Sequence, residues 1–81
     1  MDKKQLIYKI LEGLNNGVEP KFNDYDVDKD TFGDVVELMQ NEGLISGATV
    51  TRGGMGSKVM IVFLNHAKVE MSGLNYLEEN K

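Results

Sequence analysis

The chain of 81 residues contains no cysteine and only one histidine and one proline. Without cysteine it forms no disulfide, has no thiol nucleophile and lacks the usual zinc-finger ligands, which is typical of proteins in a reducing compartment. It also lacks any run of about 18 apolar residues, and no apolar stretch of signal-peptide length follows the N-terminal lysines. We therefore expect a cytoplasmic protein that does not associate with membranes.

Groups that serve in catalysis are equally scarce. His66 is the only histidine, and the sequence has neither a Gly-x-Ser-x-Gly motif nor a Walker phosphate-binding loop. Residues 52–58 are rich in glycine, but they lack the Walker spacing and join two β-rich segments instead of preceding a helix. The sequence therefore predicts a protein that is not an enzyme and has no cofactor, no catalytic residues and no small-molecule substrate.

Acidic residues are present in excess and are unevenly distributed. The formal net charge is −4, from 13 acidic and 9 basic side chains. Residues 22–45 hold seven acidic groups and one basic group, whereas the segments on either side each hold four basic and three acidic groups. Because a negative surface repels the phosphate backbone, the total charge argues against tight binding to nucleic acid.

The spacing of apolar residues predicts three helices and one short helical turn. The first helix spans about residues 3–15, the turn lies within about residues 23–27, and the last helix spans about residues 71–79. The middle helix is the most regular, because Asp28 is a suitable N-cap and Gly43 a suitable stop. The apolar residues that recur at helical spacing within it are Phe32, Val35, Val36 and Met39.

Two β-rich segments, residues 44–51 and 58–64, flank a loop with three glycines and predict a β-hairpin. Three helical elements, a hairpin and a C-terminal helix follow the element order of winged-helix proteins. In that fold the third helical element reads DNA and the hairpin forms the wing. We therefore predict a single α+β domain of winged-helix type, with a helix-turn-helix, over residues 1–81.

Short motifs are spread along nearly the whole chain, at residues 19–20, 24–27, 42–47 and 76–80 and at Phe32 and Gly73. Together they resemble the YjcQ-like family of small proteins from Gram-positive bacteria and their prophages. In that family the last helix begins with Leu-Thr, where this chain has Val69 and Glu70. The resemblance implies a winged-helix fold and no particular biochemical activity.

The predicted DNA-reading helix is acidic, and Lys29 is its only basic residue. Its acidic residues and those at its ends are Asp28, Asp30, Asp34, Glu37 and Glu42. Each carboxylate would meet a like-signed field in the major groove, so base reading by this helix is disfavoured. Arg52 and Lys58 flank the glycine loop of the predicted wing, which permits close approach to a phosphate backbone or a minor groove. The candidate nucleic-acid-binding residues are therefore Arg52, Lys58 and Lys29.

The second β-rich segment is apolar on both sides of a regular strand. One side is formed by Val59, Ile61 and Phe63, and the other by Met60, Val62 and Leu64. A half-buried hairpin needs only one apolar side. Either the last helix covers the second side, or that side meets another protein, for which the candidate interface residues are Met60, Val62 and Leu64.

Residues 26–37, which begin with Asp26 and end with Glu37, place acids at positions 1, 3, 5, 9 and 12 of an EF-hand-like loop. However, Thr31 occupies the sixth position, where the loop requires glycine, and Pro20 interrupts the incoming helix. A continuous amphipathic helix fits the apolar spacing of this segment better. Calcium binding is therefore a remote alternative, and we assign no metal site.

We expect a small non-catalytic regulatory or adaptor module that acts through an unidentified protein partner or through weak, wing-led binding to duplex DNA. The alternative is a sequence-specific transcriptional regulator. That regulator would be a homodimer, joined through the last helix or the second strand, and would contact phosphates with Arg52 and Lys58. The acidic reading helix favours the first hypothesis, because its charge opposes entry into the major groove.

Overall fold

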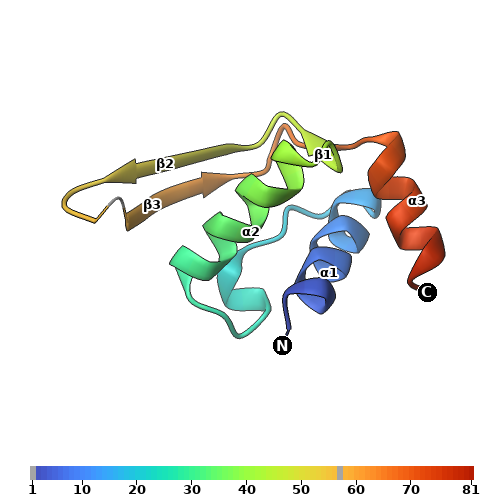
Figure 1. The fold of residues 1–81 in the computed structure, drawn as a ribbon, viewed down its shortest axis with the longest axis horizontal. Helices are drawn as coiled ribbons and strands as arrows, with labels where there is room; N and C mark the ends of the chain where they lie inside the picture. Colours follow the sequence, from blue (N-terminus) through green and yellow to red (C-terminus); the bar gives the residue numbers. More distant parts are fainter. Residues whose placement is uncertain (1, 57) are drawn as a thin grey trace.

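The computed structural model describes residues 2–56 and 58–81, with helices toward both ends of the chain and a β-hairpin between them (Figure 1). The elements are α1 (Lys3–Asn15), the 3-10 turn η1 (Phe22–Asp24), α2 (Lys29–Asn41), β1 (Ile45–Ser46), β2 (Thr49–Gly53), β3 (Lys58–Phe63), β4 (Lys68–Val69) and α3 (Met71–Glu79). The architecture is α+β, and the three predicted helices are confirmed. None of the helices in the described ranges has the length and apolar character needed to cross a bilayer.

Side chains at the predicted helix starts cap α1 and α2. The Asp2 carboxylate accepts a hydrogen bond from the Gln5 backbone N–H at 2.8 Å, and the Gln5 side chain accepts one from the Asp2 N–H. The Asp28 carboxylate accepts a hydrogen bond from the Thr31 N–H at 2.7 Å. These bonds satisfy backbone donors that a helix leaves unpaired in its first turn. Local chemistry therefore sets where both helices begin.

The core lies mainly between α1 and α2. Its most deeply buried side chains are Leu6, Ile10 and Leu11 of α1, Phe32, Val35, Val36 and Met39 of α2, and Ile45 and Leu64. Tyr25, at the end of η1, stacks on Phe32 with the ring centroids 6.2 Å apart. The lead-in to α2 therefore closes one edge of the core.

Helix α3 packs against α1 and β4, at the end of the molecule away from the hairpin tip (Figure 1). Gly73 allows this approach, because a Cβ at that position would lie 2.3 Å from the Leu44 carbonyl oxygen. Strand β3 packs mainly on β2 and α2. The proposed role of the last helix as the cover of the hairpin is therefore wrong.

The first predicted strand is broken into two shorter strands, β1 and β2, whereas the second corresponds to the single strand β3. β1 pairs antiparallel with β4, with Ile45 opposite Val69, and β2 pairs antiparallel with β3. Gly47 separates β1 from β2 with a φ of 80°, and a Cβ there would lie 2.5 Å from the His66 carbonyl oxygen. Glycine is required at this crossing because it tolerates both the left-handed backbone and the close contact. The prediction missed the two-residue strand β4.

A β-bulge interrupts the pairing of β2 with β3. Thr51 pairs with Ile61, but Arg52 pairs with Val59, so Met60 has no partner on β2. A bulge of one residue shifts every later side chain to the opposite side of the strand. The two halves of β3 therefore do not follow one alternation.

The bulge overturns the predicted sides of β3. Val59 and Leu64 are both buried, with 3% and 2% of their surfaces exposed, although strict alternation placed them on opposite sides. Val62 is half-buried against the core. Ile61 and Phe63 are exposed instead. The grouping of Met60, Val62 and Leu64 on one surface was therefore wrong.

Candidate functional site

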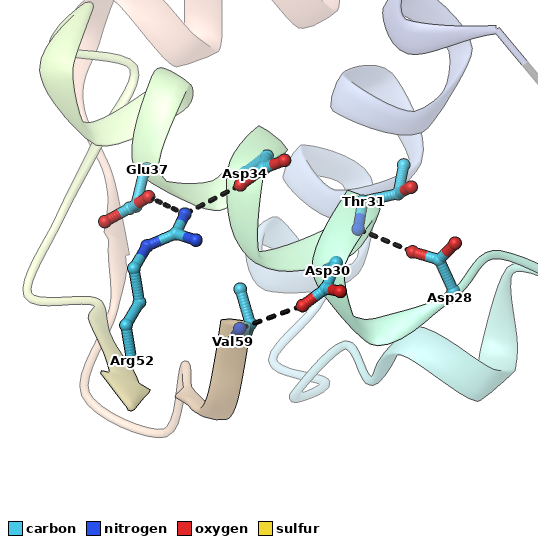
Figure 2. Close-up of polar contacts among 7 residues, drawn as sticks. All are labelled: Asp28, Asp30, Thr31, Asp34, Glu37, Arg52 and Val59. Carbon is cyan, nitrogen blue, oxygen red and sulfur yellow. Dashed lines mark hydrogen bonds and ion pairs between the residues drawn. The ribbon is translucent and has the colours of Figure 1, made fainter. Parts of the chain in front are cut away.

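Arg52 reaches from β2 toward two carboxylates of α2, those of Asp34 and Glu37 (Figure 2). Its Nη2 donates a hydrogen bond to Asp34 Oδ1 at 2.7 Å and another to Glu37 Oε1. The hydrogen bond to Glu37, and then the one to Asp34, raise the pKa of the Arg52 guanidinium above its ordinary value. The positive charge that the sequence assigned to phosphate contacts is thus paired with two acids of α2.

Two further contacts fix β3 to the N-terminal half of α2. The Asp30 carboxylate accepts a hydrogen bond from the Val59 backbone N–H at 2.8 Å (Figure 2). Gly33 faces the Val59 side chain, and a Cβ on Gly33 would lie 2.6 Å from Val59 Cγ2. Because Gly33 has no side chain, the hairpin can lie directly on α2. One side of the predicted reading helix is covered by the predicted wing.

The three candidate nucleic-acid residues do not form one basic surface. Arg52 is engaged with α2, and Lys58 is exposed at the start of β3. Lys29 is exposed at the start of α2 and lines a groove that neither of the other two residues lines. Their role in binding DNA remains a prediction.

The groove runs between β3 and the segment that leads into η1. It has a volume of about 560 Å³. One wall consists of residues 19–23, the other of residues 60–63 and Asn65, and α2 contributes Lys29 and Phe32. A concave, largely apolar site with a few polar groups is the usual form of a specific binding site. This groove is the candidate functional site.

Four apolar side chains line the groove and are also exposed to solvent. They are Phe22, Met60, Ile61 and Phe63, with 38%, 55%, 48% and 46% of their surfaces exposed, and we call them the β3 surface. Of the predicted interface residues, only Met60 is among them. Leu64 belongs to the core, because the bulge turns it inward.

The acids proposed for a calcium loop are directed to separate partners. Asp28 accepts from the Thr31 N–H, Asp30 accepts from the Val59 N–H, and the acids nearer the end of the segment bind a guanidinium (Figure 2). The hydrogen bond from the Thr31 backbone also holds the pKa of Asp28 below its ordinary value. Across residues 2–56 and 58–81, no three His, Cys, Asp or Glu side chains converge in a way that could hold a metal ion. The calcium alternative therefore has no supporting cluster.

A family model described as YjcQ protein matches residues 8–81. The chain belongs to the YjcQ family. The chain is also similar to the solution NMR structure of the YjcQ protein from Bacillus subtilis, with a TM-score of 0.64 and 28% sequence identity. That match covers 93% of this chain and 91% of the other. A comparison with curated proteins finds no match.

The family assignment confirms the resemblance noted in the sequence, and the matched residues include the whole groove. The sequence did not reveal the groove itself, because its two walls lie about 40 residues apart along the chain. It contained two partial signals. Gly33 is an isolated glycine inside a regular helix, which often marks close packing, and Pro20 marks an extended segment.

Proposed function

We propose that the chain is a non-catalytic regulatory or adaptor module of winged-helix type that binds another protein through the β3 surface. The order of α1, η1, α2 and the β2–β3 hairpin supports the winged-helix assignment, with η1 in the place of the second helix. The observation that carries the proposal is the exposure of Met60, Ile61 and Phe63 beside a groove.

Burial of the β3 surface against a partner contributes part of the driving force for association, and the remainder must come from other contacts. Complete burial of one Ile, Met or Phe side chain contributes about 1.5–3 kcal/mol. The three side chains of β3 are each about half exposed, so covering them adds a few kcal/mol in total. Clustered apolar side chains next to a concavity are typical of sites that bind other proteins.

The charges on α2 weigh against DNA as the main partner. If Arg52 turned to a phosphate, Asp34 and Glu37 would lose their cation while lying close to the same negative backbone. Wing-led contact with DNA is therefore weak and independent of sequence in this proposal. A transcriptional regulator that reads bases with α2 is the alternative that the proposal opposes.

Titration of labelled duplex DNA at physiological salt tests the choice between these partners. We expect dissociation constants no tighter than the nonspecific range of about 10⁻⁴–10⁻⁶ M, without preference among random sequences. Sequence-selective binding at about 10⁻⁸ M or tighter would contradict the proposal.

Substitution of exposed apolar residues tests the protein-binding surface. Ile61→Ser with Phe63→Ser removes half of the β3 surface, and Met71→Ser with Leu74→Ser removes exposed apolar residues from α3 as a matched control. In crosslinked capture from a lysate of the source organism, we expect the first pair of substitutions to abolish capture of a specific partner. We expect the second pair of substitutions to retain this capture. Equal loss with both pairs would show nonspecific adhesion instead.

A further inference from the structure

Strand β3 has one edge that the rest of the chain leaves largely open. Its partner in the ladder is β2, so its other edge faces the groove. At each end of that edge, a carboxylate accepts a hydrogen bond from a backbone N–H. The Val59 N–H donates to Asp30 at 2.8 Å, and the Leu64 N–H donates to Glu19 Oε2 at 3.4 Å.

Between these ends, the backbone of Val62 is directed into the groove. In an antiparallel ladder, alternate residues point their N–H and C=O groups to opposite edges. The Leu64 N–H points away from β2, and the Ile61 carbonyl lies on the β2 side, where it accepts a hydrogen bond from the Thr51 hydroxyl. The N–H of Val62 is therefore expected to point away from β2 as well, and among the described residues no hydrogen bond outside the β2–β3 ladder involves it.

The chain's own lead-in segment does not complete the sheet. Lys21 is extended, with φ −128° and ψ 150°, and lies in the opposite wall of the groove. Pro20 precedes it and has no backbone N–H to donate to a neighbouring strand. The contact between this segment and the β3 edge is made by the Glu19 side chain instead of by a backbone ladder.

The groove differs in charge from the molecule as a whole. Lys21 and Lys29 are exposed at its lining, and the ion pairs found among residues 2–56 and 58–81 involve neither of them. Glu19 is the only acidic residue of the lining, and its carboxylate already accepts from the Leu64 N–H. The lining of the groove thus holds two lysines against one glutamate, in a chain whose net charge is −4.

We propose that the groove binds an extended, acidic peptide segment of a partner protein, which adds as a third strand to the free edge of β3. The peptide backbone pairs with Val62, its apolar side chains contact the β3 surface, and its carboxylates lie beside Lys21 and Lys29. Strand addition of this kind obtains affinity from main-chain hydrogen bonds and specificity from side-chain pockets. The inference rests on the proposed protein-binding function and specifies its mode.

A second copy of the chain matches the groove less well. Strand β3 contains Lys58 and no acidic residue, so a neighbouring β3 would bring no carboxylate to Lys21 or Lys29. Pairing between two copies would also place like charges near each other, which opposes association. The charge of the lining therefore favours a different, acidic chain.

Titration with three synthetic peptides, followed by NMR of the isotope-labelled full chain, tests the inference. The peptides share an alternating Val-Thr core of equal length, and each carries the same residue, Asp, Asn or Lys, at both ends of this core. We expect the Asp peptide to shift the amide signals of Met60 and Val62 and to slow hydrogen exchange at Val62. We expect it to bind about ten-fold more tightly than the Asn peptide, through two exposed ion pairs, and the Lys peptide to bind most weakly.

Two controls separate backbone pairing from charge. N-methylation of the central Val in the Asp peptide removes its backbone donor without changing the protein, and we expect it to abolish the Val62 shift. Lys21→Glu with Lys29→Glu reverses the charge of the groove, and we expect it to reverse the peptide preference. Lys3→Glu with Lys9→Glu makes the same change of net charge on α1 and is expected to leave the preference intact.

The opposing outcomes are distinct. If no peptide perturbs Val62 while capture still depends on Ile61 and Phe63, strand addition is wrong and the proposed function stands. Equal affinity for all three peptides would refute the acidic class of partner. A dimer in light scattering, with Val62 protected and peptide excluded, would identify the occupant as a second copy. Failure of capture together with failure of peptide binding would overturn both proposals.

Discussion

The helical end of the molecule and its hairpin end are held together by different interactions. At the helical end, α1 and α2 bury side chains such as Ile10, Val36 and Met39 completely. At the hairpin end, β2 and β3 rest on α2 through an arginine–carboxylate cluster, one carboxylate–amide bond and the fit of Val59 against Gly33. Burial between the helices therefore provides most of the stability, so apolar side chains of the hairpin can remain exposed.

The largest effect should follow from a cavity in the helical end. Phe32→Ala removes a side chain that is 1% exposed and stacks on Tyr25. Such a change costs about 3–5 kcal/mol, a large part of the roughly 4–12 kcal/mol that a domain of this size has in total. Urea denaturation should show a strongly lowered midpoint. A midpoint equal to that of the original protein would show that Phe32 does not contribute to a stabilising core.

A smaller effect should follow from filling the contact between α2 and β3. Gly33→Ala would stabilise an exposed helix by about 1 kcal/mol, but here the new Cβ collides with Val59, and overpacking costs about 1–3 kcal/mol. We therefore expect net destabilisation. A double-mutant cycle with Val59→Ala checks the cause, because the shortened side chain should relieve the penalty. If the stability losses of the two substitutions were additive, the contact between Gly33 and Val59 would not be the cause of the destabilisation.

A change of about 1 kcal/mol should follow from loss of the bond between Asp30 and the Val59 N–H. Asp30→Ala leaves this donor without its carboxylate, so the Val59 amide should exchange with solvent faster. Arg52→Ala is the matched control at the same interface. Its ion pairs are exposed, so its effect on stability should be smaller and should diminish with added salt. The reverse order of the two effects would show that Arg52 is the main anchor.

The smallest effect should be a change in acid sensitivity at the start of α2. The pKa of Asp28 is lowered by the hydrogen bond from the Thr31 N–H. Its folded pKa thus lies below its unfolded pKa, so its contribution is complete above about pH 4 and is lost as the pH falls through the folded pKa. Asp28→Asn keeps a capping side chain without this titration. Melting temperatures at neutral and acidic pH should show a smaller acid loss in the variant than in the original protein.

The same contrast explains which parts of the structure could be predicted from the sequence. The spacing of Phe32, Val35 and Met39 reports one-sided burial directly, so α1 and α2 were placed correctly. The register of β3 depends on Asp30 and Gly33, which meet it only after folding. Alternation in the sequence contains no record of the bulge at Met60, so the exposed side of the strand was assigned wrongly.

The position of Pro20 has a consequence for competition within the chain. A lead-in segment able to pair with β3 would be tethered beside it at an effective concentration on the order of millimolar. Such a tethered strand would outcompete any partner of modest affinity. Because Pro20 has no backbone donor, the segment does not compete in this way for the edge of β3 that we propose as the binding site.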